Sequence, residues 1–328
     1  YKVGFPHQEI NHLRLTSNNY FLLNNGTINA DFAFQNNKRK EFADATNPDE
    51  KELFFDLNTF NYNVRYNVKE TNNWETSFGI GGMQQSNTNK GVEALIPDYQ
   101  FFDAGAFVFT QKTFNKNLTL AGGLRFDNRN VDAIEMLEDT DVKFAKFNKN
   151  YSGISGSLGL SYQLDKQSTF KLNLSRGFRA PNIAELSSNG IHEGTFRYEI
   201  GDINLKSEIS DQIDAAYFLN SDHISFEFTP FVNFISNYIY TEKMQDANGN
   251  DVIIDPNDPV PAFRFTQGNA QLFGGEIFLD FHPHPFDWLH VENSFSYVRA
   301  TQNNRPENEK FLPFIPAPKY RGEIKTNF

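Results

Sequence analysis

The sequence predicts an all-β protein, an antiparallel up-and-down transmembrane β-barrel. Three observations carry this prediction. Apolar and polar residues alternate with a period of two over long segments, aromatic residues make up 15% of a chain whose mean hydropathy is only −0.56, and short connections alternate with long ones. A period of two is that of a strand whose two faces meet different surroundings. No segment of useful length follows the helical period of about 3.6, so we expect little helix.

The run YSGISGSLGLSYQL shows the alternation most clearly. Its apolar residues Ile154, Leu158, Leu160 and Tyr162 share one parity, and small polar residues fill most of the other. The next run, TFKLNLSRGF, repeats the pattern after the short polar turn DKQS. We expect about thirteen such strands, most of them longer than the usual five or six residues. Further examples are the runs at 60–68, 118–126 and 224–234.

The connections between the expected strands are of two kinds, which alternate along the chain. Because every second connection of an up-and-down meander lies at the same end, one end should carry tight turns and the other should carry long loops. The tight connections are at 24–26, 69–73, 115–117, 165–168, 220–222 and 283–287. The long ones, expected as outer loops, are at 43–51, 88–98, 131–150, 179–206, 244–261 and 303–317.

This asymmetry favours a membrane barrel over a soluble fold. Lipid cannot satisfy an open strand edge, so strands in a membrane close on themselves, with the polar parity toward a lumen and the apolar parity toward lipid. A soluble β-sandwich also alternates, but its strands are typically shorter and its polar face meets water. It remains the weaker alternative.

Composition and missing motifs exclude several other classes. The chain has no cysteine, which excludes disulfides and thiolate metal sites, and its net charge of −11 argues against nucleic-acid binding. It contains no apolar run of about 18 residues and no signal-peptide pattern. Nucleophile-elbow, phosphate-loop and zinc-protease motifs are missing as well. We therefore expect neither an enzyme nor a cofactor.

The stretch from 174 to 208 carries a family resemblance. It contains SRGFRAPNIAEL, then NGIHEGT, then RYEIGDINLKSE, and in this order it resembles a loop of TonB-dependent outer-membrane receptors, in the variant found in Bacteroidetes. Weaker similarities keep the family's order at LIPDYQFFD, GGLRFDNR, HPHPFDWLHVENSFSYV and FLPFIPAP. The resemblance covers nearly the whole chain.

The resemblance implies that residues 1–328 form part of a larger barrel. Such receptors have an N-terminal plug, a TonB-contacting segment and a barrel of about 22 strands. We find neither the plug nor that segment in this sequence. If the long loop after Phe178 corresponds to the family's seventh outer loop, the chain runs from about strand 6 to about strand 18. It would then lack the plug domain and both ends of the barrel.

The resemblance also implies energised transport in the outer membrane of a Gram-negative bacterium. Outer loops would capture a scarce ligand, a ferric siderophore or another metal complex, and the inner-membrane TonB complex would drive its passage to the periplasm. Implied partners are outer-membrane lipid, TonB and a small-molecule or metal-chelate ligand, with no nucleic acid. A passive porin-like channel or a structural barrel is the alternative from another class.

Residues of the same stretch are the candidates for a binding site. Either they shape the loop around a ligand, or they order the loop through ion pairs and hydrogen bonds at a wet barrel rim. The candidates are Arg176, Phe178, Arg179, Pro181, Asn182, Glu185, Asn189, His192, Glu193, Arg197, Tyr198, Asn204 and Glu208. We expect no metal site, because one histidine beside one carboxylate offers too few ligands. In HPHP, we expect His282 and His284 to shape a turn.

Overall fold

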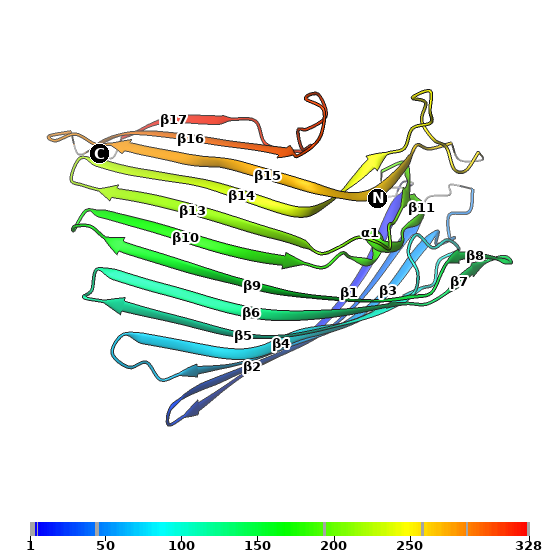
Figure 1. The fold of residues 1–328 in the computed structure, drawn as a ribbon, viewed down its shortest axis with the longest axis horizontal. Coiled ribbons are helices and arrows are strands. Elements are labelled where there is room, and N and C mark those ends of the chain that lie inside the picture. Colours follow the sequence, from blue (N-terminus) through cyan, green and yellow to red (C-terminus); the bar gives the residue numbers. More distant parts are fainter. Residues whose placement is uncertain are drawn as a thin grey trace.

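The computed structural model describes residues 4, 6–42, 46–192, 195–256, 259–286 and 288–326. Within these ranges the long strands form one antiparallel sheet that curves like a barrel wall (Figure 1). Those strands are β1 (His7–Leu23), β2 (Gly26–Phe42), β3 (Leu53–Val68), β4 (Trp74–Asn89), β5 (Tyr99–Phe114), β6 (Leu118–Ala133), β9 (Phe147–Gln163), β10 (Ser168–Arg179), β13 (Glu208–Asn220), β14 (Ile224–Lys243), β15 (Ala262–Phe281), β16 (Leu289–Gln302) and β17 (Lys319–Thr326).

The remaining elements are short and belong to two long connections. The connection after β6 contains the hairpin β7 (Met136–Glu138) and β8 (Asp141–Phe144). The connection after β10 contains the helix α1 (Ile183–Ser187) and the hairpin β11 (Asn189–His192) and β12 (Arg197–Ile200). Among the described residues, no helix has the length and apolar character needed to cross a lipid bilayer.

The predicted all-β, antiparallel architecture is confirmed. Each long strand pairs with its neighbours in the chain, and strands of up to 20 residues, such as β14, exceed the length usual in soluble sheets. Tight turns gather at one end of the strands, on the left of Figure 1, and the long connections gather at the other end. The connection after β10, expected as an outer loop, contains the regular elements α1, β11 and β12.

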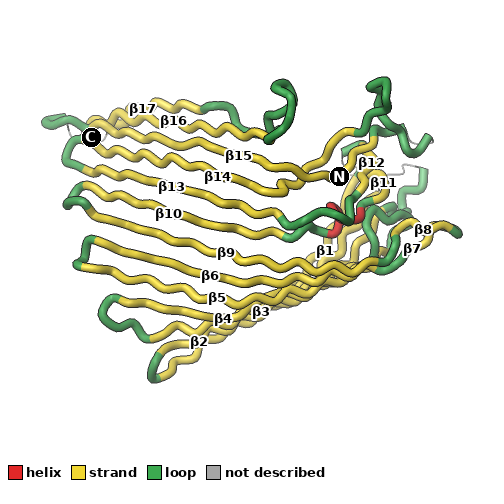
Figure 2. The backbone as a smooth tube through the Cα atoms, in the orientation of Figure 1, coloured by secondary structure: helices red, strands yellow, loops and turns green. Residues whose placement is uncertain are grey.

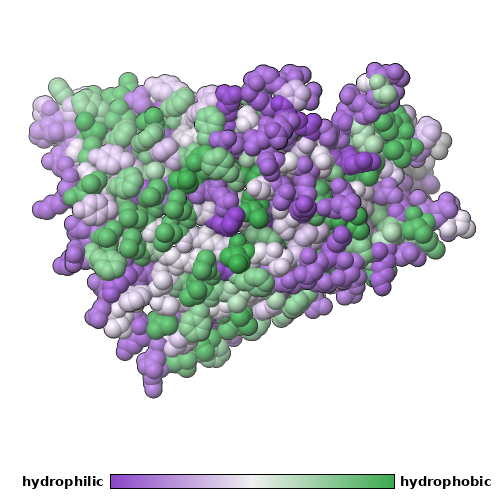
Figure 3. Space-filling model, in the orientation of Figure 1, coloured by the Kyte–Doolittle hydropathy of each residue, from purple (hydrophilic) through white to green (hydrophobic). Residues whose placement is uncertain are grey.

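The two faces of the sheet differ as the alternation requires. Ile80, Leu124 and Ile154 are between 54% and 63% exposed on the face that carries the apolar parity. The opposite face carries residues such as Arg125 and Arg129, which form ion pairs along the wall. Figure 3 shows apolar side chains spread over the strands toward the tight-turn end, with polar ones gathered toward the long connections. This is the pattern of a sheet with one face toward lipid and one toward a lumen.

The two margins of the sheet are open in the described residues. There, β1 pairs with β2 alone and β17 pairs with β16 alone. In a membrane, unpaired backbone N–H and C=O groups at such margins cost several kcal/mol each. Among the described residues, the strands therefore form an arc of a barrel wall rather than a closed barrel.

The main buried core lies at the long-connection end, where the 180–207 connection folds back onto the wall. Figure 2 shows α1 lying against the strands at this end. Leu186 and Leu205 from the connection are at most 3% exposed, and they pack with Val131 and Ala133 of β6. The connection therefore belongs to the packed structure of the barrel wall.

Candidate functional site

The 180–207 connection begins with a helix whose first turn is fully capped. The side chain of Asn182 accepts a hydrogen bond from the Glu185 backbone N–H at 2.9 Å. The Glu185 carboxylate accepts in return from the Asn182 backbone N–H at 2.8 Å. This capping box satisfies two backbone donors that a short helix otherwise leaves without partners. Pro181, just before the cap, is buried and has a fixed φ, so the chain enters the helix at a set angle.

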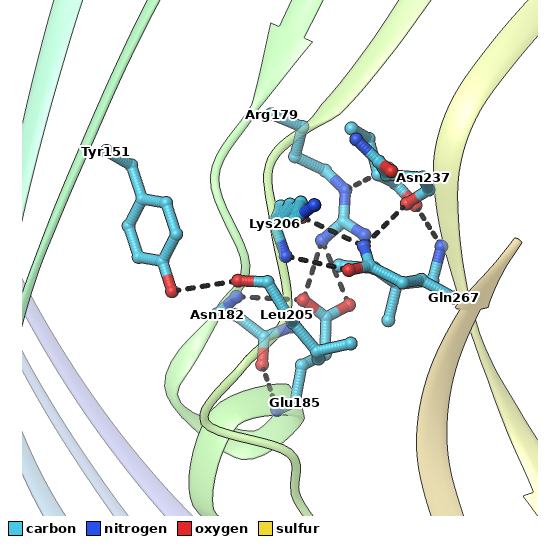
Figure 4. Close-up of polar contacts among 10 residues, drawn as sticks. Tyr151, Arg179, Asn182, Glu185, Leu205, Lys206, Asn237 and Gln267 are labelled. Atoms are coloured by element: carbon cyan, nitrogen blue, oxygen red, sulfur yellow. Dashed lines mark hydrogen bonds and ion pairs between the residues drawn. The ribbon is translucent and has the colours of Figure 1, made fainter.

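An arginine at the end of β10 ties this helix to the barrel wall (Figure 4). Arg179 Nη1 donates to both carboxylate oxygens of Glu185 at 2.9 Å, and Arg179 Nε donates to Glu208 at 2.5 Å. Glu208 is the first residue of β13 and pairs directly with Arg179 in the sheet. Its other oxygen accepts from the Ile239 backbone N–H on β14 at 2.6 Å. One guanidinium thus joins α1 to two neighbouring strands, in the forked geometry that arginine favours.

The far end of the connection is held by polar contacts to three strands (Figure 4). Tyr151 on β9 donates its hydroxyl to the Leu205 carbonyl at 3.2 Å. Gln267 on β15 accepts from the Lys206 N–H at 2.9 Å and donates to the Lys206 carbonyl at 3.1 Å. Asn237 on β14 donates to the Ser207 carbonyl at 3.0 Å. The backbone of this segment therefore has partners on both sides, as a buried segment requires.

Between these anchors, the hairpin β11–β12 extends the sheet. Tyr198 of β12 pairs in parallel with Ala262 of β15, and its hydroxyl donates to the Asn189 side chain at 2.9 Å. Asn189 in turn donates to the Lys143 carbonyl on β8 at 3.0 Å, which joins the two long connections. Gly201 passes so close to α1 that a Cβ there would lie 2.2 Å from the Ser187 backbone nitrogen. Glycine is thus required at this crossing.

A charged group on the hairpin lines a cavity of about 540 Å³ near the long-connection end. Glu199 is 6% exposed, and its Oε1 lies 3.2 Å from His192 Nδ1 and 3.1 Å from Arg197 Nε. Arg197 also lies over the Phe263 ring, 5.2 Å from its centroid. The hydrogen bond that His192 donates to Glu199 raises the pKa of His192, although burial opposes the shift. Burial alone would raise the pKa of Glu199, but His192 and Arg197 together lower it.

These shifts predict that the hairpin is pH-sensitive. Because the pKa of His192 is raised above 6.5, its contribution to stability is complete below that pH and is lost as the pH rises through the raised value. Because the pKa of Glu199 is lowered below 4.5, its contribution is present above that pH and is lost as the pH falls through the lowered value. We expect peptides from 189–200 to exchange hydrogen more slowly at pH 6 than at pH 8, after correction for intrinsic rates.

The matched variant for this prediction is His192→Gln, which keeps a side chain of similar size but cannot be protonated. In this variant the difference in protection between pH 6 and pH 8 should vanish, since the titrating partner of Glu199 is gone. A pH difference that persists unchanged in His192→Gln would contradict the assignment.

Next to the first residues of the connection, the lumen face has a charged cavity of about 320 Å³, which is smaller than the one beside Glu199. Arg129 forms a two-pronged ion pair with Asp103, with distances of 2.7 and 2.6 Å. Arg125 Nε donates to both carboxylate oxygens of Asp127, at 2.7 and 2.8 Å. The ring of Phe178 closes one side of this cavity. Fixed charges of both signs in a concave, partly desolvated place can select a polar or charged ligand.

Phe178 reaches this cavity because of a glycine on the neighbouring strand. A Cβ at Gly153 of β9 would lie only 2.1 Å from the Phe178 ring. Phe178 also packs against the core that includes Tyr151 and Ile183. The side chain therefore lies on the lumen side at the root of the loop.

Arg176 is separated from the other sequence candidates. It forms an ion pair with Asp211 at 3.0 Å and is 54% exposed. This pair lies on the face of the sheet that carries Leu174 and Ile213, beside a shallow hollow of about 790 Å³ lined by apolar side chains and glycine backbone. Although this hollow is larger than the lumen cavities, it opens on the lipid-facing parity and is a poor site for a polar ligand.

The remaining candidates are brought together with different roles. The structure gathers Phe178, Arg179, Pro181, Asn182, Glu185 and Glu208 at the root of the connection, and Asn189, His192, Arg197 and Tyr198 on the hairpin. Asn204 donates its backbone N–H to Asp202 at 2.8 Å in a turn. Glu193 lies outside the described residues.

Sequence reasoning missed the lumen charges of β5 and β6. Arg125, Asp127 and Arg129 fall on the polar parity of β6, so the signal for them was present in the alternation, whereas Asp103 shares its parity in β5 with Phe101 and Phe107. What the alternation does not give is the register that places Arg129 opposite Asp103. Register in long meanders depends on every preceding turn, so one strand's pattern cannot set it.

An antiparallel wall with a lipid-facing parity, a charged lumen and one end of long connections is the architecture of a transmembrane β-barrel (Figure 1). A family model described as "TonB dependent receptor-like, beta-barrel" matches residues 1–328. The chain belongs to this family.

Individual relatives agree with this family. The chain is 23% identical over 286 residues to the TonB-dependent heme receptor A of Haemophilus influenzae (strain 86-028NP), a match that covers 78% of this chain and 37% of that protein. Among solved structures, it superposes on the copper transporter OprC with a TM-score of 0.73 at 16% identity, over 98% of this chain and 50% of OprC. It also superposes on the ferric yersiniabactin uptake receptor FyuA of Yersinia pestis, with a TM-score of 0.62 at 12% identity, over 98% of this chain and 48% of FyuA.

These matches span the chain far more completely than they span the relatives. The chain corresponds to about half the length of the solved structures and to 37% of the haem receptor. At such identities the solved structures establish the shared fold, and the open margins at β1 and β17 agree with an arc of a larger barrel.

Proposed function

We propose that this chain is the barrel segment of a TonB-dependent transporter in the outer membrane of a Gram-negative bacterium. The observation that carries the proposal is the 180–207 connection, which folds back onto the wall above the charged cavity formed by Asp103, Arg125, Asp127 and Arg129. A loop fixed above fixed lumen charges supports ligand capture followed by passage.

The proposed orientation puts the tight turns in the periplasm and the long connections outside the cell. A ligand would meet the outer connections first, then the cavity of about 540 Å³ beside His192 and Glu199, and then the lumen charges near Phe178. Release would require movement of a plug domain, which belongs to the part of the family architecture outside the described wall. TonB would be the partner that drives this movement.

We propose a metal complex as the ligand, a ferric siderophore or a haem-like chelate. The relatives support this class because their names refer to haem, copper and ferric yersiniabactin. Mixed charges in the lumen suit chelates, which carry polar and charged groups around a metal. The loop sequence from 174 to 208 further supports an origin among the Bacteroidetes.

The proposed transporter performs no covalent chemistry. The ion pairs of Arg179 and Arg129 shape the loop and the wall. A passive porin-like channel is less well supported, because the family model matches energised receptors over the whole chain.

The proposal is tested by uptake in the organism. A strain that lacks the gene should lose growth on one metal chelate as the sole source of that metal and regain it when the intact gene is restored. Uptake of the labelled chelate should stop when TonB is deleted or when a protonophore collapses the inner-membrane gradient. Uptake that continues at the same rate after either treatment would favour the passive channel instead.

A further inference from the structure

The tight-turn end of the β15–β16 hairpin brings three metal-ligand side chains onto one face. Asp280 is the next-to-last residue of β15, His282 follows the strand, and His290 is the second residue of β16. The register pairs Phe281 with Val291, so one further step sets His282 opposite His290. Because side chains alternate between faces, Asp280 lies on the same face as His282. That face is the lumen face, since Phe281 is exposed on the apolar one.

The distances within this cluster suit coordination of one ion. His290 Nδ1 lies 2.9 Å from Asp280 Oδ2, and His282 Nδ1 lies 3.2 Å from the same oxygen. One ligand atom from each residue lies within 4.8 Å of the other two. With metal–ligand bonds of about 2.1 Å, neighbouring ligand atoms are about 3.0 to 3.4 Å apart, depending on the coordination geometry. The 3.2 Å separation falls within this range, and the 2.9 Å separation, which is also a hydrogen bond between His290 and Asp280, lies just below it.

Buried polar atoms in the cluster lack the partners that such atoms normally have. Asp280 Oδ1 and His282 Nδ1 are buried and make no hydrogen bond within the part of the chain that the structure describes. The close approach of His282 to Asp280 therefore has a geometry other than that of a hydrogen bond. The nearby Lys325 on β17 donates to both oxygens of Glu292, at 2.7 Å each. Its charge therefore neutralises Glu292 and not the carboxylate of Asp280. Leaving buried polar atoms unsatisfied is costly, and a bound cation would remove that cost.

We propose that Asp280, His282 and His290 bind a divalent first-row transition-metal ion at the tight-turn end of the lumen. Two imidazole nitrogens and one carboxylate suit Zn²⁺, Ni²⁺ or Cu²⁺, whereas Ca²⁺ and Mg²⁺ need more oxygen ligands. Three protein ligands leave a coordination position open for water or for an exchangeable ligand. The site lies at the opposite end of the wall from the 180–207 connection, and the proposal does not depend on the proposed uptake function.

His282 and His284, which the HPHP sequence predicts to shape a turn, have different neighbours in the structure. His284 lies with its ring centroid 5.9 Å from that of His223 and is absent from the cluster. His282 instead faces His290, with 5.2 Å between ring centroids. The turn brings together residues that are eight positions apart, which spacing along a single strand does not predict.

Titration of Zn²⁺ into the full-length purified protein tests the proposal. We expect saturable binding of one Zn²⁺ per chain in calorimetry with citrate as a weak competing chelator. Asp280→Asn and His290→Gln should each weaken Zn²⁺ binding by more than about tenfold, since removing a mere supporting group already costs that much. His223→Gln is the matched control, because it removes an imidazole from the same end of the wall and should leave the affinity unchanged.

A second measurement needs no variant. With Cu²⁺ as the probe, electron paramagnetic resonance of the unaltered protein should show coupling to two imidazole nitrogens. Absence of nitrogen coupling, absence of Zn²⁺ binding, or wild-type affinity in Asp280→Asn would each overturn the proposal. So would an equal loss of affinity in His223→Gln, because the binding would then lie outside the three residues.

Discussion

Replacing Arg179 by leucine should release the 180–207 connection from the barrel wall while the strands remain paired. The substitution leaves two carboxylates, Glu185 and Glu208, without their shared cation, although their side chains are only 11% and 13% exposed. Breaking a buried ion pair on one side typically costs several kcal/mol. Because the Arg179 side chain is itself 42% exposed, we expect roughly 3 kcal/mol for local opening of the connection.

Hydrogen exchange measured by mass spectrometry reports this opening directly. A cost of roughly 3 kcal/mol corresponds to about 100-fold faster exchange in the peptides that cover α1, β11 and β12. Peptides from β2 to β6 should exchange as in the wild type, because their partners are other strands. Ligand affinity should fall together with the protection of the connection, if that connection forms part of the capture site.

Arg176→Leu is the matched control, since the same residue type is removed only three positions away. Its ion pair with Asp211 is about half exposed on the lipid-facing parity, and exposed pairs contribute about 0 to 1 kcal/mol. Protection of the connection should therefore remain unchanged in this variant. Equal loosening in Arg176→Leu and Arg179→Leu would show that the Arg179 contacts do not hold the loop.

The wall was largely predictable from the sequence because its physics is local. Alternation in a run such as 154–164 depends only on which parity meets lipid, and the structure has strand β9 with Ile154 and Leu158 exposed as that rule requires. The loop was less predictable. Its helix of five residues is too short to show a helical period, and its stability comes from tertiary contacts to Arg179 and Tyr151.

The candidate residues also differ in whether a local sequence pattern could predict their positions. A capping box is a local pattern, so Asn182 and Glu185 can be read from their spacing of three once a helix is expected. The separation of Arg176 from Arg179 was not predicted, because both were assigned to the loop as one charged group. Strand parity puts an even-numbered residue of β10, such as Leu174, on the lipid-facing side, and Arg176 follows it. Extending the alternation by one step from Leu174 would have revealed the place of Arg176, but a further step would have misplaced Phe178, whose ring lies over Gly153 on the lumen side.

Deleting residues 182–204 should abolish high-affinity uptake and leave the barrel folded. The deletion is compatible with the wall because Arg179 and Glu208 already pair across the two strands. It leaves residues 180, 181, 205, 206 and 207 as the connection, a length that hairpins commonly use. The loss follows from removing both the hairpin that lines the cavity near His192 and the cover above the lumen charges.

The control replaces residues 246–250, the exposed tip of another long connection, by the two-residue turn Asn-Gly. Gln245 and Asp251 already form a bridge across the base of that tip, and a two-residue turn is enough to keep them paired. Both variants should keep the β-sheet signal in circular dichroism and the mobility of a folded barrel on unheated gels. Labelled-ligand uptake should then be lost in the first and retained in the second. Normal uptake by a correctly inserted 182–204 deletion would mean that the connection serves only to order the rim, because capture would have survived the loss of every residue between Asn182 and Asn204.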